Sequence, residues 1–298
     1  MPRRSAGAMY RMNNPEIQHF YHAGTGTLSY VVSDPATASA AVIDPVLGFD
    51  IVSGRSDASQ ARDIVEYLGA RDLKLQWILE THAHADHLSG AQYIRASLGG
   101  NVAIGEGIRS VQEHFGKIFN LKAPFRPDGH QFDQLFADGE SFSIGTLPVE
   151  VIATPGHTSD SVTYRIGNAA FIGDTMFMPD AGTARCDFPG GDAGLLFDSI
   201  SRILSLPADT RLFVCHDYQP GGRELQFETT VREQAANNIH IGNGRSREEF
   251  IELRETRDRG LNLPALILPA LQINIRAGNL PPAEDNQVVY LKIPLDLV

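Results

Sequence analysis

The stretch Thr81-His82-Ala83-His84-Ala85-Asp86-His87 places three imidazoles and one carboxylate within six consecutive positions. It follows the apolar run LQWIL at 75–79, which predicts a short buried strand. Imidazole nitrogen and carboxylate oxygen are ligands that suit zinc, iron and manganese. A single histidine after a strand is usually a structural residue, whereas three at this spacing indicate a metal site.

Three further candidate ligands, His157, Asp174 and His216, each follow another apolar run that is typical of a strand. Ligands at the ends of strands share one edge of a sheet stack, where the strands hold them rigidly and the loops leave access. Gly156 and Gly173 precede two of these residues and permit a tight turn of the backbone. Each segment alone is typical of a turn, but together with the histidine-rich stretch they predict one metal centre.

The composition is that of an ordinary globular protein, with 298 residues, 42% hydrophobic and 20% charged. A formal net charge of −11 disfavours a nucleic-acid partner, because phosphate binding requires a basic surface. No apolar run approaches the ~20 residues of a membrane span, so we expect no membrane partner. The two cysteines, Cys186 and Cys215, are too few for a disulfide framework and favour a reducing, cytoplasmic location.

Apolar periodicity and turn signals predict β hairpins interspersed with helices. Strands are expected at 28–32, 41–43, 75–79, 102–104, 149–153, 162–166, 169–172 and 211–214, and helices at 57–68, 91–98, 195–203 and 246–253. The segment 105–145 reads as irregular, and the proline-rich segment 261–298 as extended chain on the surface. We expect a flexible tail at 1–14 and a single domain at 15–298, with a C-terminal extension from about residue 221.

The order of the candidate ligands resembles that of the metallo-β-lactamase fold over about residues 15–220. The resemblance implies an α/β (α+β) protein, an αββα sandwich of two mixed β-sheets with helices on the outer faces and the metal site at one edge. It further implies that two ions could be held, the first by His82, His84, His157 and Asp174 and the second by Asp86, His87, Asp174 and His216. Asp174 would then bridge the ions, because one carboxylate has two oxygens.

The segment 182–191, GTARCDFPGG, resembles a loop of the persulfide dioxygenases, and 271–278 and 284–286 resemble bacterial beta-lactamase-like hydrolases of sulfide detoxification. This resemblance implies one Fe(II) per chain, and the catalytic ligands would be His82, His157 and Asp174. The remaining residues would support the iron or form an unused second site: His84, Asp86, His87 and His216. The implied reaction oxidises glutathione persulfide, or a related persulfide, with O2 to sulfite and glutathione. The apolar, proline-rich tail would also suit a homodimer surface.

The same ligands suit a different enzyme, a zinc thioester hydrolase of the glyoxalase II kind with one or two Zn(II). Glyoxalase II carries a longer helical substrate domain after its ligands, for which the sequence shows no equivalent. A non-catalytic persulfide- or metal-binding sensor is disfavoured because every matched ligand is intact. Dioxygenase and dinuclear hydrolase both stay open here, and metal content and S-lactoylglutathione turnover separate them.

Four residues are candidates for contact with the substrate. Arg185 and Asp187 lie in the 182–191 loop, where Arg185 could bind a glutathione carboxylate as a fork or pair with Asp187. Tyr218 closely follows the last candidate ligand and could donate a hydrogen bond to the substrate. Arg223 lies in a glycine-rich loop and is a candidate for carboxylate binding.

Cys186 lies beside a cation that could lower its thiol pKa, although a packed, unreactive thiol is the expected state. Cys215 ends an apolar run and is expected in the core. The remaining histidines lack ligand spacing and are expected to be structural: His19, His22, His114, His130 and His240.

Overall fold

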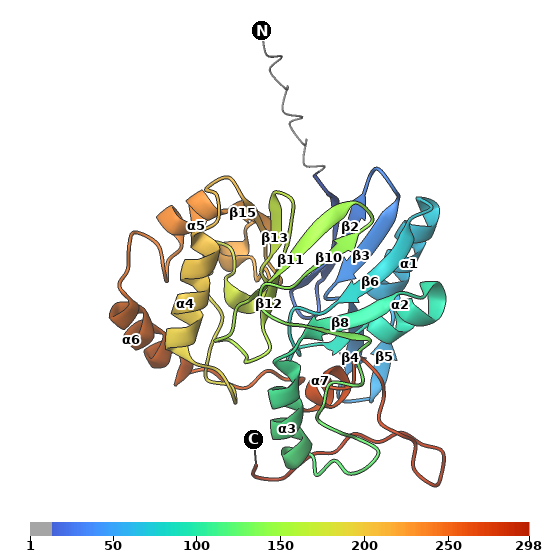
Figure 1. Ribbon diagram of the computed structural model, residues 1–298. Helices are drawn as coiled ribbons and strands as arrows, with labels where there is room; N and C mark the ends of the chain where they lie inside the picture. The colour runs from blue at the N-terminus through green and yellow to red at the C-terminus, as the bar shows by residue number, and fades with distance from the viewer. Residues whose placement is uncertain (1–13, 298) are drawn as a thin grey trace.

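The computed structural model describes residues 14–297, so the expected flexible tail at 1–14 lies almost wholly outside the described residues. The chain forms two six-stranded sheets. They lie at the centre of the molecule, as Figure 1 shows. The first contains, in spatial order, β1 (Glu16–His22), β2 (Thr27–Asp34), β3 (Ser39–Ile43), β6 (Lys74–Leu79), β8 (Asn101–Gly105) and β9 (Gln134–Phe136). The second contains β10 (Ser141–Ile144), β11 (Leu147–Ala153), β12 (Val162–Ile166), β13 (Ala169–Phe171), β14 (Arg211–Phe213) and β15 (Glu228–Thr230).

Both sheets are mixed, as the resemblance implied. In the first, β1, β2 and β3 pair antiparallel, whereas β3, β6, β8 and β9 pair parallel. The second is antiparallel except for the parallel pair β13 and β14. A small third sheet is formed by β4 (Val46–Asp50), β5 (Arg55–Asp57) and β7 (Leu88–Ser89).

The core lies between the two large sheets, and β2 shows why the chain folds this way. Successive side chains of a strand point to opposite faces. Tyr30 and Val32 accordingly join the core shared with the second sheet, while Val31 joins the cluster under the outer helices. All eight residues of β2 are buried, as expected for a strand covered on both faces.

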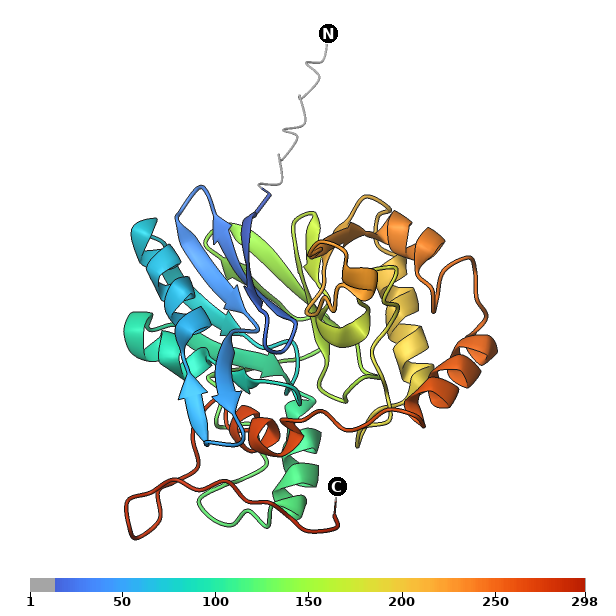
Figure 2. The same ribbon diagram turned by 180° about the vertical axis from the view of Figure 1, so that it is seen from behind.

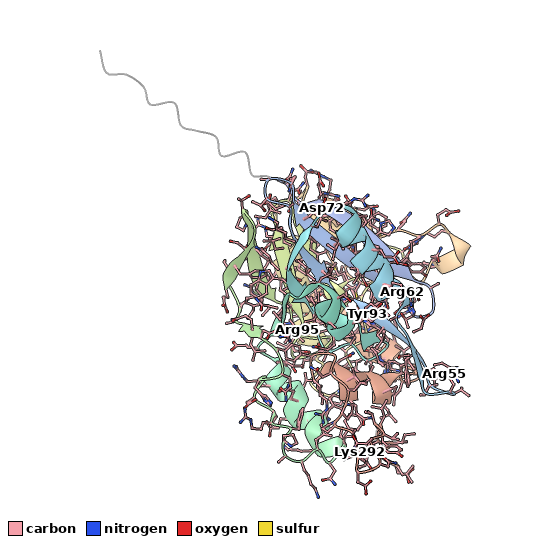
Figure 3. All side chains as sticks on the ribbon, turned by 90° about the vertical axis from the view of Figure 1, so that its right-hand side faces the viewer. Arg55, Arg62, Asp72, Tyr93, Arg95 and Lys292 are labelled. Atoms are coloured by element: carbon pink, nitrogen blue, oxygen red, sulfur yellow. The ribbon has the colours of Figure 1, made fainter. Side chains whose placement is uncertain are left out.

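Helices cover the outer faces, which confirms the αββα sandwich. The first sheet is covered by α1 (Ser59–Ala70) and α2 (Ala91–Leu98), and Figure 3 shows these two helices side by side with Arg62 and Tyr93 near their contact. The second sheet is covered by α4 (Ala193–Leu204) and α5 (Val231–Asn237), and α6 (Arg247–Asp258) packs against α4. The capping box expected at 246–249 is present at the start of α6. Among the described residues, no helix is long and apolar enough to cross a membrane.

The segment 105–145 is not irregular throughout, because it contains α3 (Ile108–Ile118), β9 and β10. Ile108, Val111 and Phe115 form a buried helical stripe, but no side chain caps the start of α3, so the usual start signal is missing. Lys292 donates to the carbonyls of Phe119 and Asn120 just after this helix (Figure 3).

The tail 261–298 also contains an unexpected element, α7 (Ile267–Asn274), where extended surface chain was expected. Its apolar residues are buried over most of its circumference, so they show no polar face that would mark a surface helix. Pro269 fits because it lies in the first turn, where backbone N–H groups have no partner within the helix. Figure 2 shows α7 beside the small third sheet, from which β7 contacts it.

Candidate metal centre

Loops from both large sheets bring the candidate ligands together. His82, His84 and His87 lie between β6 and β7, and Asp174 lies in the 3-10 turn Gly173–Thr175 after β13. Two glycines fit as expected. Gly156 (φ +134°) leaves no room for a Cβ beside the backbone of Leu196, and Gly173 (φ +50°) packs against Thr81. These close approaches hold His157 and Asp174 against the rest of the site.

The first group consists of His82, His157 and Asp174, whose donor atoms all lie within 4.8 Å of one another. Oδ2 of Asp174 is 3.6 Å from Nε2 of His157 and 3.9 Å from Nε2 of His82. All three side chains are buried, and Nε2 of His82 has no hydrogen-bond partner among residues 14–297. A buried, unpartnered nitrogen is unfavourable, and a metal ion between these atoms would satisfy it.

Neighbouring oxygens orient both imidazoles of this group. Nδ1 of His157 lies 2.7 Å from the carbonyl oxygen of Arg185, which can only accept, so Nδ1 carries the proton and Nε2 is a free lone pair. Nδ1 of His82 lies 3.1 Å from the hydroxyl of Thr81, which donates to Asp44 at 2.9 Å. The Thr81 oxygen therefore accepts from His82, and again Nε2 is left for an ion.

A second group, His84, Asp86, His87 and His216, also has its donor atoms within 4.8 Å of one another. Nε2 of His216 is 3.4 Å from Oδ2 of Asp86 and 3.5 Å from Oδ1 of Asp174. The two oxygens of Asp174 therefore face different groups, which is the geometry of a bridging carboxylate. The residues present fit either one ion in the first group or a pair of ions.

Two buried acids behind the histidines were not found from the sequence. Asp44 Oδ1 lies 3.0 Å from Nε2 of His84, and Oε2 of Glu80 lies 3.9 Å from the same atom. Burial raises the pKa of Glu80, and the nearby carboxylate of Asp44 adds to this effect. In the sequence, each of these residues is simply an acid that follows a predicted strand. That pattern is too common to indicate a role in a metal site.

Burial and mutual proximity set the charge of the imidazoles. Burial, reinforced by the charge that His84 would carry, lowers the pKa of His82 well below its usual value. Burial and His87 do the same for His84. Neutral imidazoles are the form that binds a metal. Burial would also lower the pKa of His216, but the carboxylates of Asp174 and Asp86 outweigh it and raise that pKa.

The comparison with known proteins agrees with this geometry. Residues 23–216 match the protein family described as "Metallo-beta-lactamase superfamily". The chain belongs to the metallo-beta-lactamase superfamily. It is 46% identical to a "Probable metallo-hydrolase" of Burkholderia pseudomallei, over 95% of this chain and 99% of that protein. It is 31% identical to "Persulfide dioxygenase ETHE1, mitochondrial" of Homo sapiens, over 88% of each chain. The crystal structure of ETHE1 from Myxococcus xanthus superposes with a TM-score of 0.71 at 28% identity, over 89% of this chain and all of that one.

A cavity of about 390 Å³ opens beside the two ligand groups. Asp86, His157 and Asp174 are among the residues that line it. Its walls come from the loop after Asp174 and from the C-terminal region: Phe177, Ala181, Thr183, Ala184, Arg185, Phe188, Tyr218, His240, Arg254, Arg257, Leu261 and Pro264.

Of the four expected substrate residues, Arg185 and Tyr218 line this cavity. Arg185 binds Asp187 as a fork, with N···O distances of 2.6 and 2.7 Å, and its Nη1 donates to the carbonyl of Asn262. The guanidinium is therefore held by the protein, and Asp187 anchors it from outside the cavity lining. The ring of Tyr218 is 58% exposed and stacks on His216 with a centroid distance of 5.5 Å.

Arg223, the fourth candidate, does not line the cavity. It donates to Asp180 and Asp217 and so fixes the loop that follows His216. Cys186 is packed, as expected, and the neighbouring Arg185 does not lower its thiol pKa. Burial and the carboxylate of Asp258, 3.4 Å from the sulfur, raise the pKa of Cys186 to about 12.

Residues of the C-terminal region take part in the site although the sequence predicted no role for them there, and Asn274 and His240 are two examples. Asn274 in α7 donates to the carbonyls of His84 and His87 and accepts from the N–H of Ser89, so it holds the histidine-rich loop. His240, expected to be only structural, lines the cavity. The absence of ligand spacing around His240 says nothing about whether its side chain lines a cavity, which is why this position was missed.

Proposed function

We propose that the protein is an iron-dependent persulfide dioxygenase, which converts glutathione persulfide, O2 and water to sulfite and glutathione. The observation that carries the proposal is the group His82, His157 and Asp174, two imidazoles and one carboxylate beside a cavity. Such a face leaves open positions on non-haem Fe(II), which supplies O2 binding and electron transfer when bound. The 31% identity to human ETHE1 along 88% of the chain supports the same reaction.

The chain's own residues would hold the reactants in place. Phe177 and Phe188 line the cavity and would exclude water beside the first group. The guanidinium of Arg185 lies 4.8 Å from the centre of the Phe188 ring and fixes that wall. The Arg185 carbonyl meanwhile keeps the His157 imidazole turned toward Asp174. The proposal gives His84, Asp86, His87 and His216 a supporting role around the iron.

A dinuclear zinc thioester hydrolase is the second candidate. The observation in its favour is that Asp174 faces both groups, with Oδ2 near His157 and Oδ1 near His216. The name of the Burkholderia relative, a probable metallo-hydrolase, points the same way. In that enzyme the second group would hold an ion of its own, and the two ions would activate a water molecule together.

Oxygen uptake separates the two candidates. Protein loaded anaerobically with Fe(II), with iron content verified, is mixed with aerated buffer and glutathione persulfide, and dissolved oxygen and sulfite are recorded. The dioxygenase consumes one O2 per sulfite formed, and the zinc-loaded protein, as the matched control, consumes none. Absence of uptake by verified iron protein, together with S-lactoylglutathione hydrolysis by zinc protein, would establish the hydrolase instead.

We also propose that residues 15–298 act as one domain and that the protein works in the cytoplasm. Asn274 in α7 holds the histidine-rich loop and Arg257 in α6 lines the cavity, so the C-terminal extension takes part in the site. Both thiols, Cys186 and Cys215, are unpaired and buried, as a reducing compartment would leave them.

A further inference from the structure

His240 presents one unused polar atom beside the metal centre. Its side chain is 3% exposed and lines the cavity that also contains His157 and Asp174. Nε2 of His240 is buried and has no hydrogen-bond partner among the described residues, 14–297. A buried polar atom without a partner is unfavourable, and a molecule bound in the cavity that His240 lines would supply one.

The contacts of the other ring nitrogen fix the tautomer. The backbone N–H of Thr183 points at Nδ1 of His240 from 2.9 Å, and Nη1 of Arg254 lies 3.4 Å away. Both of these groups can only donate, so Nδ1 must accept and carries no proton. In the neutral ring the proton is then on Nε2, which makes that atom a hydrogen-bond donor.

The surroundings also keep the ring neutral. Burial lowers the pKa of His240 to about 4, and the guanidinium groups of Arg254 and Arg257 contribute. Arg254 is itself buried and paired with Asp258 at 2.6 Å, so it stays in place as a charged neighbour. His240 is therefore a neutral donor at neutral pH, held in place by these contacts.

Arg257 adds an available positive charge to the same wall. Arg185 and Arg254 also line the cavity, but each is paired with a carboxylate, Asp187 and Asp258 respectively. Arg257 is exposed, and its side chain forms no ion pair or hydrogen bond with any other residue in the described range. The free guanidinium of Arg257 suits a carboxylate of a ligand, and the neutral N–H of His240 suits an amide or carboxylate oxygen of the same ligand.

We propose that His240 and Arg257 form the recognition site for the thiol carrier of the substrate, and that this carrier is a peptide-like thiol with a free carboxylate. Nε2–H of His240 donates to a carbonyl or carboxylate oxygen of the carrier, and Arg257 binds its carboxylate at the cavity mouth. The inference rests on the proposed function only in that glutathione is such a carrier. Both residues lie beyond 23–216, the part of the chain that matches the superfamily description.

Calorimetry of S-methylglutathione binding to the metal-loaded protein tests this without any turnover. The probe is a thioether and lacks the terminal persulfide sulfur that the proposed reaction oxidises. Arg257→Gln should weaken binding about tenfold, the loss of one charge-assisted contact worth ~1.4 kcal/mol. Arg259→Gln is the matched control, since Arg259 is exposed near the end of the same helix but does not line the cavity, and its affinity should stay within about twofold.

For His240, the pair His240→Phe and His240→Gln separates recognition from packing. Phe removes the donor, and we expect binding about fivefold weaker; Gln keeps an N–H donor in reach, and we expect it to recover part of the loss. The diethyl ester of the probe should bind the unsubstituted protein about tenfold more weakly than the acid, and Arg257→Gln should no longer discriminate between them.

The inference is overturned if the unsubstituted protein does not bind the probe, or if Arg257→Gln discriminates acid from ester as the unsubstituted protein does. Equal affinities of His240→Phe and His240→Gln would remove His240 from the recognition site. Because no chemistry occurs, probe binding with the expected losses would stand even if the oxygen-uptake test failed. Failure of binding with normal oxygen uptake would leave the dioxygenase intact.

Discussion

The carbonyl oxygen of Arg185 lies 2.7 Å from Nδ1 of His157, so a backbone atom of the loop after Asp174 sets the orientation of a candidate ligand. That loop is held in turn by the fork between Arg185 and Asp187 and by the bond from Arg185 to the carbonyl of Asn262. Two roles were expected for Arg185, a fork to a glutathione carboxylate or a pair with Asp187. The contacts show the pair with Asp187, which positions the loop.

Asp187→Ala should therefore weaken metal binding, although Asp187 touches no candidate ligand. Loss of the fork frees Arg185, and the Arg185 carbonyl then holds His157 less firmly. Partners that orient a ligand typically change metal affinity by about 10–100-fold. Competition with a calibrated chelator measures the effect. Asp198→Ala removes another exposed arginine pair, with Arg247, and should leave the affinity unchanged. Equal affinities of the two variants would refute the positioning role.

Asp174→Ala should abolish both metal retention and turnover while leaving the fold in place. The two oxygens of this carboxylate face the two ligand groups, at 3.6 Å from His157 and 3.5 Å from His216. Metal analysis after gel filtration and oxygen uptake measure the two losses, and circular dichroism checks that the fold persists. A variant that kept its iron and full turnover would show that Asp174 is not a ligand.

Asn274→Ala should destabilise the protein and loosen the metal site together. The side chain makes three buried hydrogen bonds, to the carbonyls of His84 and His87 and from the N–H of Ser89. Alanine leaves these groups without partners, which costs about 2–4 kcal/mol in the free energy of unfolding. Urea denaturation of the metal-free protein isolates this term from the contribution of the ion.

The control for Asn274 is Asn279→Ala, which removes one exposed hydrogen bond, to the carbonyl of Arg276, just after the same helix. Its free energy of unfolding should change by less than about 1 kcal/mol. If both variants lose equally little, the histidine-rich loop does not depend on α7.

The parts of the site that were predicted from the sequence have local signals. A short apolar run marks each strand, and the histidines and acids follow directly, as at Leu79 and Phe171. The order of these segments along the chain indicated the superfamily, and the superfamily implied the αββα sandwich. Residues that follow strands of one sheet stack lie at the same edge of that stack. The predicted ligands, which each follow a strand, were therefore brought together.

The missing parts depend on contacts between distant segments. Asn274 meets the carbonyl of His84 across 190 positions, and His240 meets the N–H of Thr183 across 57. No local period marks either residue, because each is fixed by long-range hydrogen bonds rather than by a repeated pattern. The helix α7 was missed for a related reason: a helix buried on most sides lacks the polar face that distinguishes a helical period.

The turn after β2 predicts how stability falls in acid. The carboxylate of Asp34 accepts from the N–H groups of Ala36 and Thr146 and from the hydroxyls of Thr37 and Thr146, and so ties β2 to the turn between β10 and β11. Burial alone would raise the pKa of Asp34, but these four donors lower it to about 2. The folded state therefore favours the ionised carboxylate more than the unfolded chain does.

The sign follows from proton binding. Between about pH 4 and pH 2 the unfolded chain takes up a proton at Asp34 more readily than the folded protein, so stability falls as the pH falls through this window. Asp34→Ala should cost about 1–3 kcal/mol at pH 6, and the difference from the unsubstituted protein should shrink towards pH 2. Urea denaturation of both proteins from pH 6 to pH 2 measures that difference in the free energy of unfolding. The contributions of the carboxylates that the two proteins share cancel in this difference. Asp209→Ala, at an exposed pair with Arg232, should cost at most about 1 kcal/mol at pH 6. A constant Asp34→Ala difference across the whole range would show that the four donors do not favour the ionised form.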